Sequence, residues 1–159
     1  MVIMKKRAQA GFKELRGKLI DTIENHDTGS FYEKKWDHSG EGGGLMSVLE
    51  GSIIEKGGVN ISTVSGEFSE TMQKRIPGAE KDPSYWATGI SVVLHPKKPN
   101  IPSMHFNTRF LSTTQSWFGG GMDITPCLEF GTEEKEFHKS IRSMCDKHNL
   151  SLIHISEPT

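Results

Sequence analysis

Five hydrogen-bonding side chains fall on alternate positions of two short runs in this sequence; they are Ser91 and His95 in the first run and His105, Asn107 and Arg109 in the second. Side chains on a β-strand alternate between two faces, so two strands would gather all five on one polar face. A guanidinium offers a planar fork for a carboxylate, and an amide can both donate and accept. A histidine titrates near neutral pH, so His105 suits proton transfer or metal binding.

A third run, residues 117–125, adds a carboxylate to this face. Asp123 and Thr125 share one side of the predicted strand, and the three preceding glycines allow close backbone approach. Arg109 and Asp123 on one face would suit a ligand that has acidic arms and N–H donors. The alternative interpretation is an internal salt bridge with ordinary core histidines, because ion-pair networks perturb such sites without catalysing anything.

The elements that position these side chains are predicted to be antiparallel strands. The segment 96–103 carries three prolines, so it cannot continue a ladder and is predicted to connect two neighbouring strands. Upstream, further strands are predicted at residues 45–50, 52–55 and 59–64, with a flexible entry at 40–44, Gly51 between the first two strands and a turn or bulge at 57–58. Such a run of strands with short turns argues for an antiparallel sheet.

Two helices are predicted to flank the sheet, which makes the fold class α+β. The first covers residues 2 to about 25, with an apolar stripe formed by Ala8, Phe12, Leu15, Leu19 and Ile23. The second covers Glu133–His148, with Thr132 as a candidate N-cap and either Met144 or Cys145 facing inward. By this pattern alone, His138 is a surface histidine. Residues 69–84 are predicted to form a polar surface loop.

Composition excludes several classes of function. The 159 residues suit one domain, and a net charge of −1 does not indicate a surface that binds nucleic acid. No apolar run approaches the roughly 18 residues of a membrane span, and the start of the chain does not resemble a secretory signal. Cys127 and Cys145 are too few for a disulfide framework, so both are predicted to be reduced. These features indicate a cytoplasmic protein.

Three long segments resemble oxygen-dependent coproporphyrinogen-III oxidase; they are GGGLMSVLEGSIIEKGGVNISTVSGEF, YWATGISVVLHPKKPNIPSMHFNTRFL and SWFGGGMDITPCLEF. The resemblance runs from about Phe31 to Asn149. Several long blocks in the same order are far more specific than a single glycine motif. The resemblance implies an amino-terminal half of that enzyme, with a large, flat antiparallel sheet flanked by helices in a homodimer.

The implied reaction converts two propionates of coproporphyrinogen III to vinyl groups and gives protoporphyrinogen IX. Molecular oxygen is the oxidant, with no flavin or haem. The resemblance implies the following roles: substrate binding by Ser91, Asn107, Thr108 and Arg109, proton donation by His105, contact with the pyrrole N–H groups by Asp123, and ligation of a divalent metal by His95, His105 and His138. A fourth implied ligand lies beyond Asn149. A metal-bound imidazole nitrogen cannot carry a proton, so the two roles of His105 compete.

Residues 1–149 are therefore predicted to be the amino-terminal part of one oxidase domain. Residues 150–159 depart from the family and look like a translated sequencing adapter, so they are excluded from the fold prediction. The chain alone is expected to be inactive and to fold poorly. Two alternative functions are a non-catalytic tetrapyrrole-binding module and a histidine metal-binding module.

Overall fold

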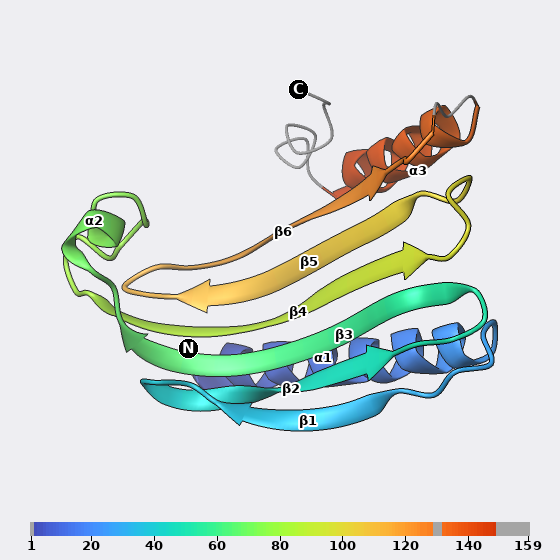
Figure 1. The fold of residues 1–159 in the computed structure, drawn as a ribbon. Coiled ribbons are helices and arrows are strands. Elements are labelled where there is room, and N and C mark those ends of the chain that lie inside the picture. The colour runs from blue at the N-terminus through green and yellow to red at the C-terminus, as the bar shows by residue number, and fades with distance from the viewer. Residues whose placement is uncertain (1, 129–131, 149–159) are drawn as a thin grey trace.

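A six-stranded antiparallel sheet forms one layer of the molecule, and helices form a second layer on one of its faces (Figure 1). The computed structural model describes residues 2–128 and 132–148, so the predicted adapter-derived tail lies outside the described residues. The elements are α1 (Val2–Glu24), β1 (Tyr32–Asp37), β2 (Glu41–Leu49), β3 (Ile54–Glu67), α2 (Glu70–Gln73), β4 (Ser84–Pro96), β5 (Ser103–Ser112), β6 (Ser116–Thr125) and α3 (Thr132–His148). The predicted α+β class is confirmed.

The strands lie in the sheet in the same order as in the chain, and each pairs antiparallel with the next. The predicted pairing across the proline-rich connection is confirmed, because β4 pairs with β5. The predicted flexible entry at residues 40–44 is wrong, because Gly43 and Gly44 belong to β2. They pair with Asp37 and Trp36 of β1, a strand that was not predicted.

The turn or bulge predicted at residues 57–58 is also misplaced, because β3 runs through both glycines. Its pairing register shifts between Ile54 and Lys56, and the turn lies at residues 50–53. Asp27, just after α1, determines this position. Its carboxylate accepts the backbone N–H groups of Ser52, Ile53 and Ile54. Burial raises the pKa of Asp27, but these hydrogen bonds outweigh it and hold the pKa well below its usual range. A contact from a distant residue therefore selects the turn.

The core lies between α1 and the sheet, and the predicted helical stripe is confirmed. The buried cluster consists of Ala8, Phe12, Val59, Ile90, Val92 and Phe110. Leu15, Leu19 and Ile23 pack against it from the same helix. Burial of this stripe supplies the main force that holds α1 against β3 and β4.

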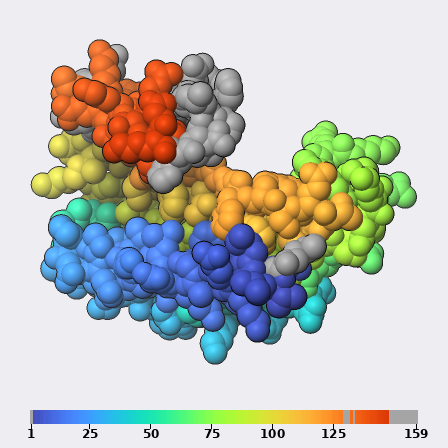
Figure 2. Space-filling view, turned by 180° about the vertical axis from the view of Figure 1, so that it is seen from behind, coloured from blue at the N-terminus to red at the C-terminus, as the bar shows by residue number. Residues whose placement is uncertain are grey.

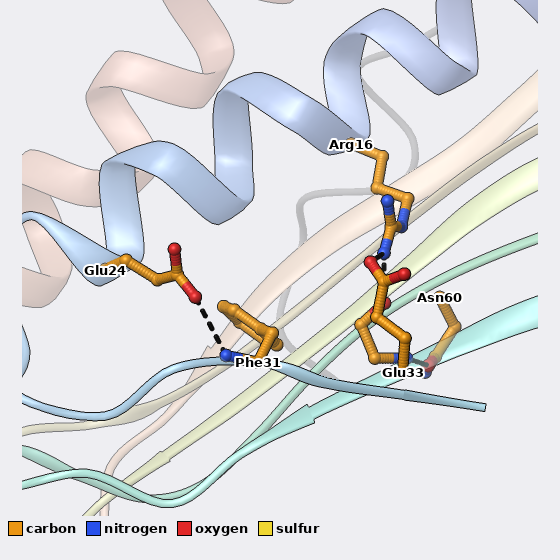
Figure 3. A network of polar contacts seen from close by, with 6 residues as sticks. Arg16, Glu24, Phe31, Glu33 and Asn60 are labelled. Atoms are coloured by element: carbon orange, nitrogen blue, oxygen red, sulfur yellow. Dashed lines mark hydrogen bonds and ion pairs between the residues drawn. The ribbon is translucent and has the colours of Figure 1, made fainter.

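Polar contacts also attach α1 to the sheet (Figure 3). The Arg16 guanidinium forms an ion pair with Glu33 on β1 and donates to the Oγ of Ser47, which is fully buried, at 2.5 Å. About two turns further along α1, Glu24 accepts the backbone N–H of Phe31 at 2.8 Å. These contacts determine where β1 lies along the edge of the sheet.

The helix α3 lies on the same side of the sheet as α1, and both face the viewer in Figure 2. Cys145, with 6% exposure, is the inward residue, whereas Met144 is 51% exposed. Between α3 and the strands β5 and β6 lies an apolar hollow of about 320 Å³, bordered by Phe106, Met122 and Ile141 among others. None of the described helices is long and apolar enough to cross a membrane.

The predicted surface loop at residues 69–84 contains the short helix α2 at one end of the sheet (Figure 1). The hydroxyl groups of Thr113 and Thr114 donate to the carbonyls of Pro77 and Gly78 at 2.8 and 2.9 Å. These bonds attach the loop to the β5–β6 turn.

Candidate functional site on the open face of the sheet

The strand register divides the residues of β4, β5 and β6 between two faces as predicted. Ser91 lies opposite Asn107, Gly89 opposite Arg109, and His105 opposite Asp123. Residues that are directly opposite share a face. The face that carries Ile90, Val92 and Phe110 packs on α1. The other face, which we call the open face, is not covered by any helix within residues 2–128 and 132–148.

Cross-strand pairs arrange the open face in rows that run from strand to strand. The Arg109 row contains Trp36, Gly44, Ser62, Gly89, Arg109 and Gly119. The Asn107 row contains Asn60, Ser91, Asn107 and Gly121, and the His105 row contains Gly58, Val93, His105 and Asp123. Neighbouring rows are two residues apart, or about 6.7 Å along a strand.

Arg109 is exposed, and its Nη2 donates to the Oδ1 of Asn107 at 3.0 Å. This bond links the Arg109 row to the Asn107 row and restrains one side of the guanidinium. The other N–H groups of the planar fork are directed away from this bond and suit a carboxylate. The hydrogen bond therefore restrains the guanidinium in an orientation whose geometry suits an anion.

Asp123 is exposed on the same face, two rows from Arg109. Its Oδ2 accepts the hydroxyl of Thr125 at 3.2 Å, as their shared face predicted. Four residues of strand separate the Arg109 row from the His105 row, or about 13 Å. No ion pair in the described part of the chain joins Arg109 to Asp123. The alternative interpretation of an internal salt bridge is therefore wrong, and both charges face outward.

The two histidines of the central strands lie side by side. The ring centroids of His95 and His105 are 5.7 Å apart, with the rings nearly perpendicular. His138 is on α3, on the other side of the sheet, where its Nε2 lies 3.9 Å from the Oε1 of Glu134. Among the described residues, no three histidine, cysteine, aspartate or glutamate side chains converge as a metal site requires. The three implied ligands thus do not meet in one copy of the chain.

Thr108 also differs in position from the other implied substrate residues. It lies opposite Ile90 and Gly120 and borders the apolar hollow beneath α3. The period of two along β5 places its side chain on the helix-covered face, whereas Asn107 and Arg109 face the other way. Only the backbone of Thr108 can border the open face.

A second hollow, of about 490 Å³, lies on the open face around the Arg109 and Asn107 rows. Its polar wall includes Ser91, Asn107 and Arg109, which the sequence analysis placed on one face. Three bordering residues were missed by the sequence analysis: Trp36, Asn60 and Ser62. The alternation in residues 59–64 was a usable signal for Asn60 and Ser62. Trp36 could not be identified without β1, and the position of that strand depends on tertiary contacts.

Comparison with known proteins assigns a family to this arrangement. The family model described as coproporphyrinogen III oxidase matches residues 7–155. The protein named oxygen-dependent coproporphyrinogen-III oxidase from Rickettsia bellii (strain OSU 85-389) is 51% identical over 121 residues. Those of Rickettsia felis and Rickettsia akari are 51% identical over 121 and 119 residues. The matches cover 76%, 76% and 75% of this chain, and the chain spans 43% of each relative's length.

Proposed function

Because the chain belongs to the coproporphyrinogen III oxidase family, we propose that its open face binds coproporphyrinogen III for oxidative decarboxylation. The reaction converts two propionates to vinyl groups, with molecular oxygen as the oxidant and without flavin or haem. The observation that carries this proposal is that Arg109 and Asp123 share one face and form no ion pair with each other or with another residue in the described part of the chain. Their rows lie about 13 Å apart along the strands, which suits a substrate with acidic arms around a ring of N–H groups.

Arg109 holds a propionate in this proposal. Its contact with Asn107 at 3.0 Å orients the guanidinium, so less rotational freedom is lost when a carboxylate binds. Ser91 lies directly opposite Asn107 and provides a hydroxyl in the same row. A bidentate, charge-assisted contact at Arg109 fixes both the position and the orientation of the acidic arm.

Asp123 faces the pyrrole N–H groups. Oxidation at a pyrrole ring builds positive charge, which a fixed carboxylate stabilises. His105 lies directly opposite Asp123 on the neighbouring strand and acts as the proton donor. Binding at the Arg109 row and proton transfer at the His105 row thus occupy different parts of one face.

No step in this proposal passes through a metal. His95 and His105 are adjacent, but His138 lies across the sheet from them, so the donor set in one copy of the chain does not fit one ion. In this proposal His105 acts as the proton donor, because a ring nitrogen that binds a metal cannot carry a proton. We further propose a cytoplasmic homodimer, on the basis of the family resemblance.

Two other functions predict different results. A tetrapyrrole-binding module would use the same residues without oxidising the ligand. A histidine metal-binding module requires a converging third ligand, and the described residues provide none. Arg109 and Asp123 on the open face favour tetrapyrrole binding, and the test below separates binding alone from oxidation.

The test uses an extended protein, in which the chain through Asn149 continues with the part of the Rickettsia bellii relative beyond the match. Coproporphyrinogen III is added under air and under nitrogen, and the products are separated by chromatography. The oxidase proposal expects protoporphyrinogen IX only under air. Binding without conversion under air would support the binding module instead. No binding under either gas would contradict both.

A further inference from the structure

The Arg109 row crosses all six strands and has large side chains at only two of its positions. Trp36 occupies the row on β1 and Arg109 occupies it on β5. Between them lie Gly44, Ser62 and Gly89, so only hydrogen atoms and one hydroxymethyl group rise from the sheet. Four strand spacings, or about 19 Å, separate the backbones of Trp36 and Arg109. The row therefore has a low floor between an aromatic and a cationic side chain.

The indole of Trp36 leans inward over this floor. A Cβ atom added to Gly44 would lie 2.7 Å from both Cε2 and Cζ2 of the indole, so the ring lies over Gly44 of the neighbouring strand. Trp36 nevertheless remains 40% exposed, and it borders the 490 Å³ hollow together with Ser62 and Arg109. An exposed indole at the end of a hollow provides a flat apolar surface for a ligand.

Gly89 keeps the opposite end of the floor open. A Cβ atom at this position would lie 3.0 Å from the Cβ of Arg109 and 2.7 Å from the carbonyl oxygen of Thr108. A larger residue would therefore push against the strand that carries Arg109. The absence of a side chain allows a large ring to approach the backbone while an acidic arm reaches the guanidinium.

We propose that Trp36 is a substrate-binding residue that packs its indole against the tetrapyrrole ring while Arg109 holds a propionate. This inference rests on the function proposed above and deepens it. The two contacts lie at opposite ends of one row, so together they determine how far the ring slides across the sheet. Arg109 alone would fix one arm and leave the ring free to pivot about it.

The test measures equilibrium binding of coproporphyrin III, the stable oxidised ring with the same acidic arms, to the extended protein in the absence of oxygen. Trp36→Ala should weaken binding by about tenfold or more, since it removes both stacking and apolar contact. Trp36→Phe should retain most of the affinity, because a smaller aromatic ring still stacks.

Trp86→Phe is the matched control. Trp86 lies on the helix-covered face, with the Nζ of Lys5 5.2 Å from the centre of its ring, and should leave the affinity unchanged. Steady-state kinetics provide a second readout. Trp36→Ala should raise KM for coproporphyrinogen III more than it lowers kcat, since the indole contact is made equally in the ground and transition states.

The outcomes separate the two proposals. If Trp36→Ala binds coproporphyrin III as tightly as the parent, the role of Trp36 is refuted, while conversion by the parent leaves the oxidase function intact. If Trp36→Phe is as weak as Trp36→Ala, stacking is refuted as the cause. If the parent neither binds nor converts the tetrapyrrole, the proposed function fails and this inference fails with it.

Discussion

Replacement of Arg109 by lysine tests the anion-binding part of the open face most directly. The guanidinium donates to the Oδ1 of Asn107 at 3.0 Å and presents its other N–H groups outward. Lysine keeps the positive charge, but its ammonium is a single point and cannot contact Asn107 and both oxygens of a carboxylate in one plane. Arg109→Lys thus isolates the geometry of the contact from its charge.

The expected loss follows from the number of bonds removed. A hydrogen bond to a charged group contributes about 1.5–3 kcal/mol, and about 1.4 kcal/mol corresponds to a factor of ten in rate or binding. One such bond therefore predicts a fall in kcat/KM of about 10- to 150-fold. Arg109 is exposed, and water competes for its N–H groups, so the lower end of this range is expected.

The assay compares kcat/KM for coproporphyrinogen III in the extended protein and in its Arg109→Lys variant. Arg142→Lys provides the control, because Arg142 is an exposed arginine on α3, on the other side of the sheet. The control should retain parental activity. An unchanged kcat/KM in Arg109→Lys, with circular dichroism like that of the parent, would show that Arg109 does not bind the substrate.

Three further predictions follow from particular contacts. Asp123→Asn keeps the shape and removes the charge, so kcat should fall by about tenfold or more; a parental rate in a folded variant would make Asp123 structural. Asp27→Asn should lower the free energy of unfolding at neutral pH. Because the pKa of Asp27 is depressed in the folded state, the stability difference between parent and variant is full above the ordinary pKa of 3.8 and disappears as the pH falls through the folded pKa. Denaturant titrations of both proteins across this pH range measure the difference. The 159-residue chain alone should self-associate, because Phe118 and Met144 are 55% and 51% exposed. It should also lack oxidase activity, since it spans 43% of the length of its relatives. A monomer in sedimentation would contradict the first expectation, and conversion under air would contradict the second.

Local patterns in the sequence were sufficient for the two long helices, α1 and α3, and for the division of the central strands between two faces. The stripe of α1 follows from helical spacing, and the opposite faces of Ile90 and Ser91 follow from the period of two in a strand. The same period already separated Thr108 from Arg109, although the family resemblance placed both in the substrate site. Such periodicities depend only on covalent geometry, so they can be predicted without knowledge of any neighbouring element.

Tertiary structure decided which residues lie opposite one another and which segments become strands. Asp27 selects the turn before β3, and contacts of α1 with β1 bring Trp36 to the end of the Arg109 row. The sequence alone also provides no distance between His138 and His105. Each of these relations joins residues that are distant in the chain, so it depends on how apolar burial and hydrogen bonding are satisfied for the whole sheet at once. The sequence by itself therefore determined the chemistry available on the open face, and only the folded sheet determined which of those groups can act on one ligand.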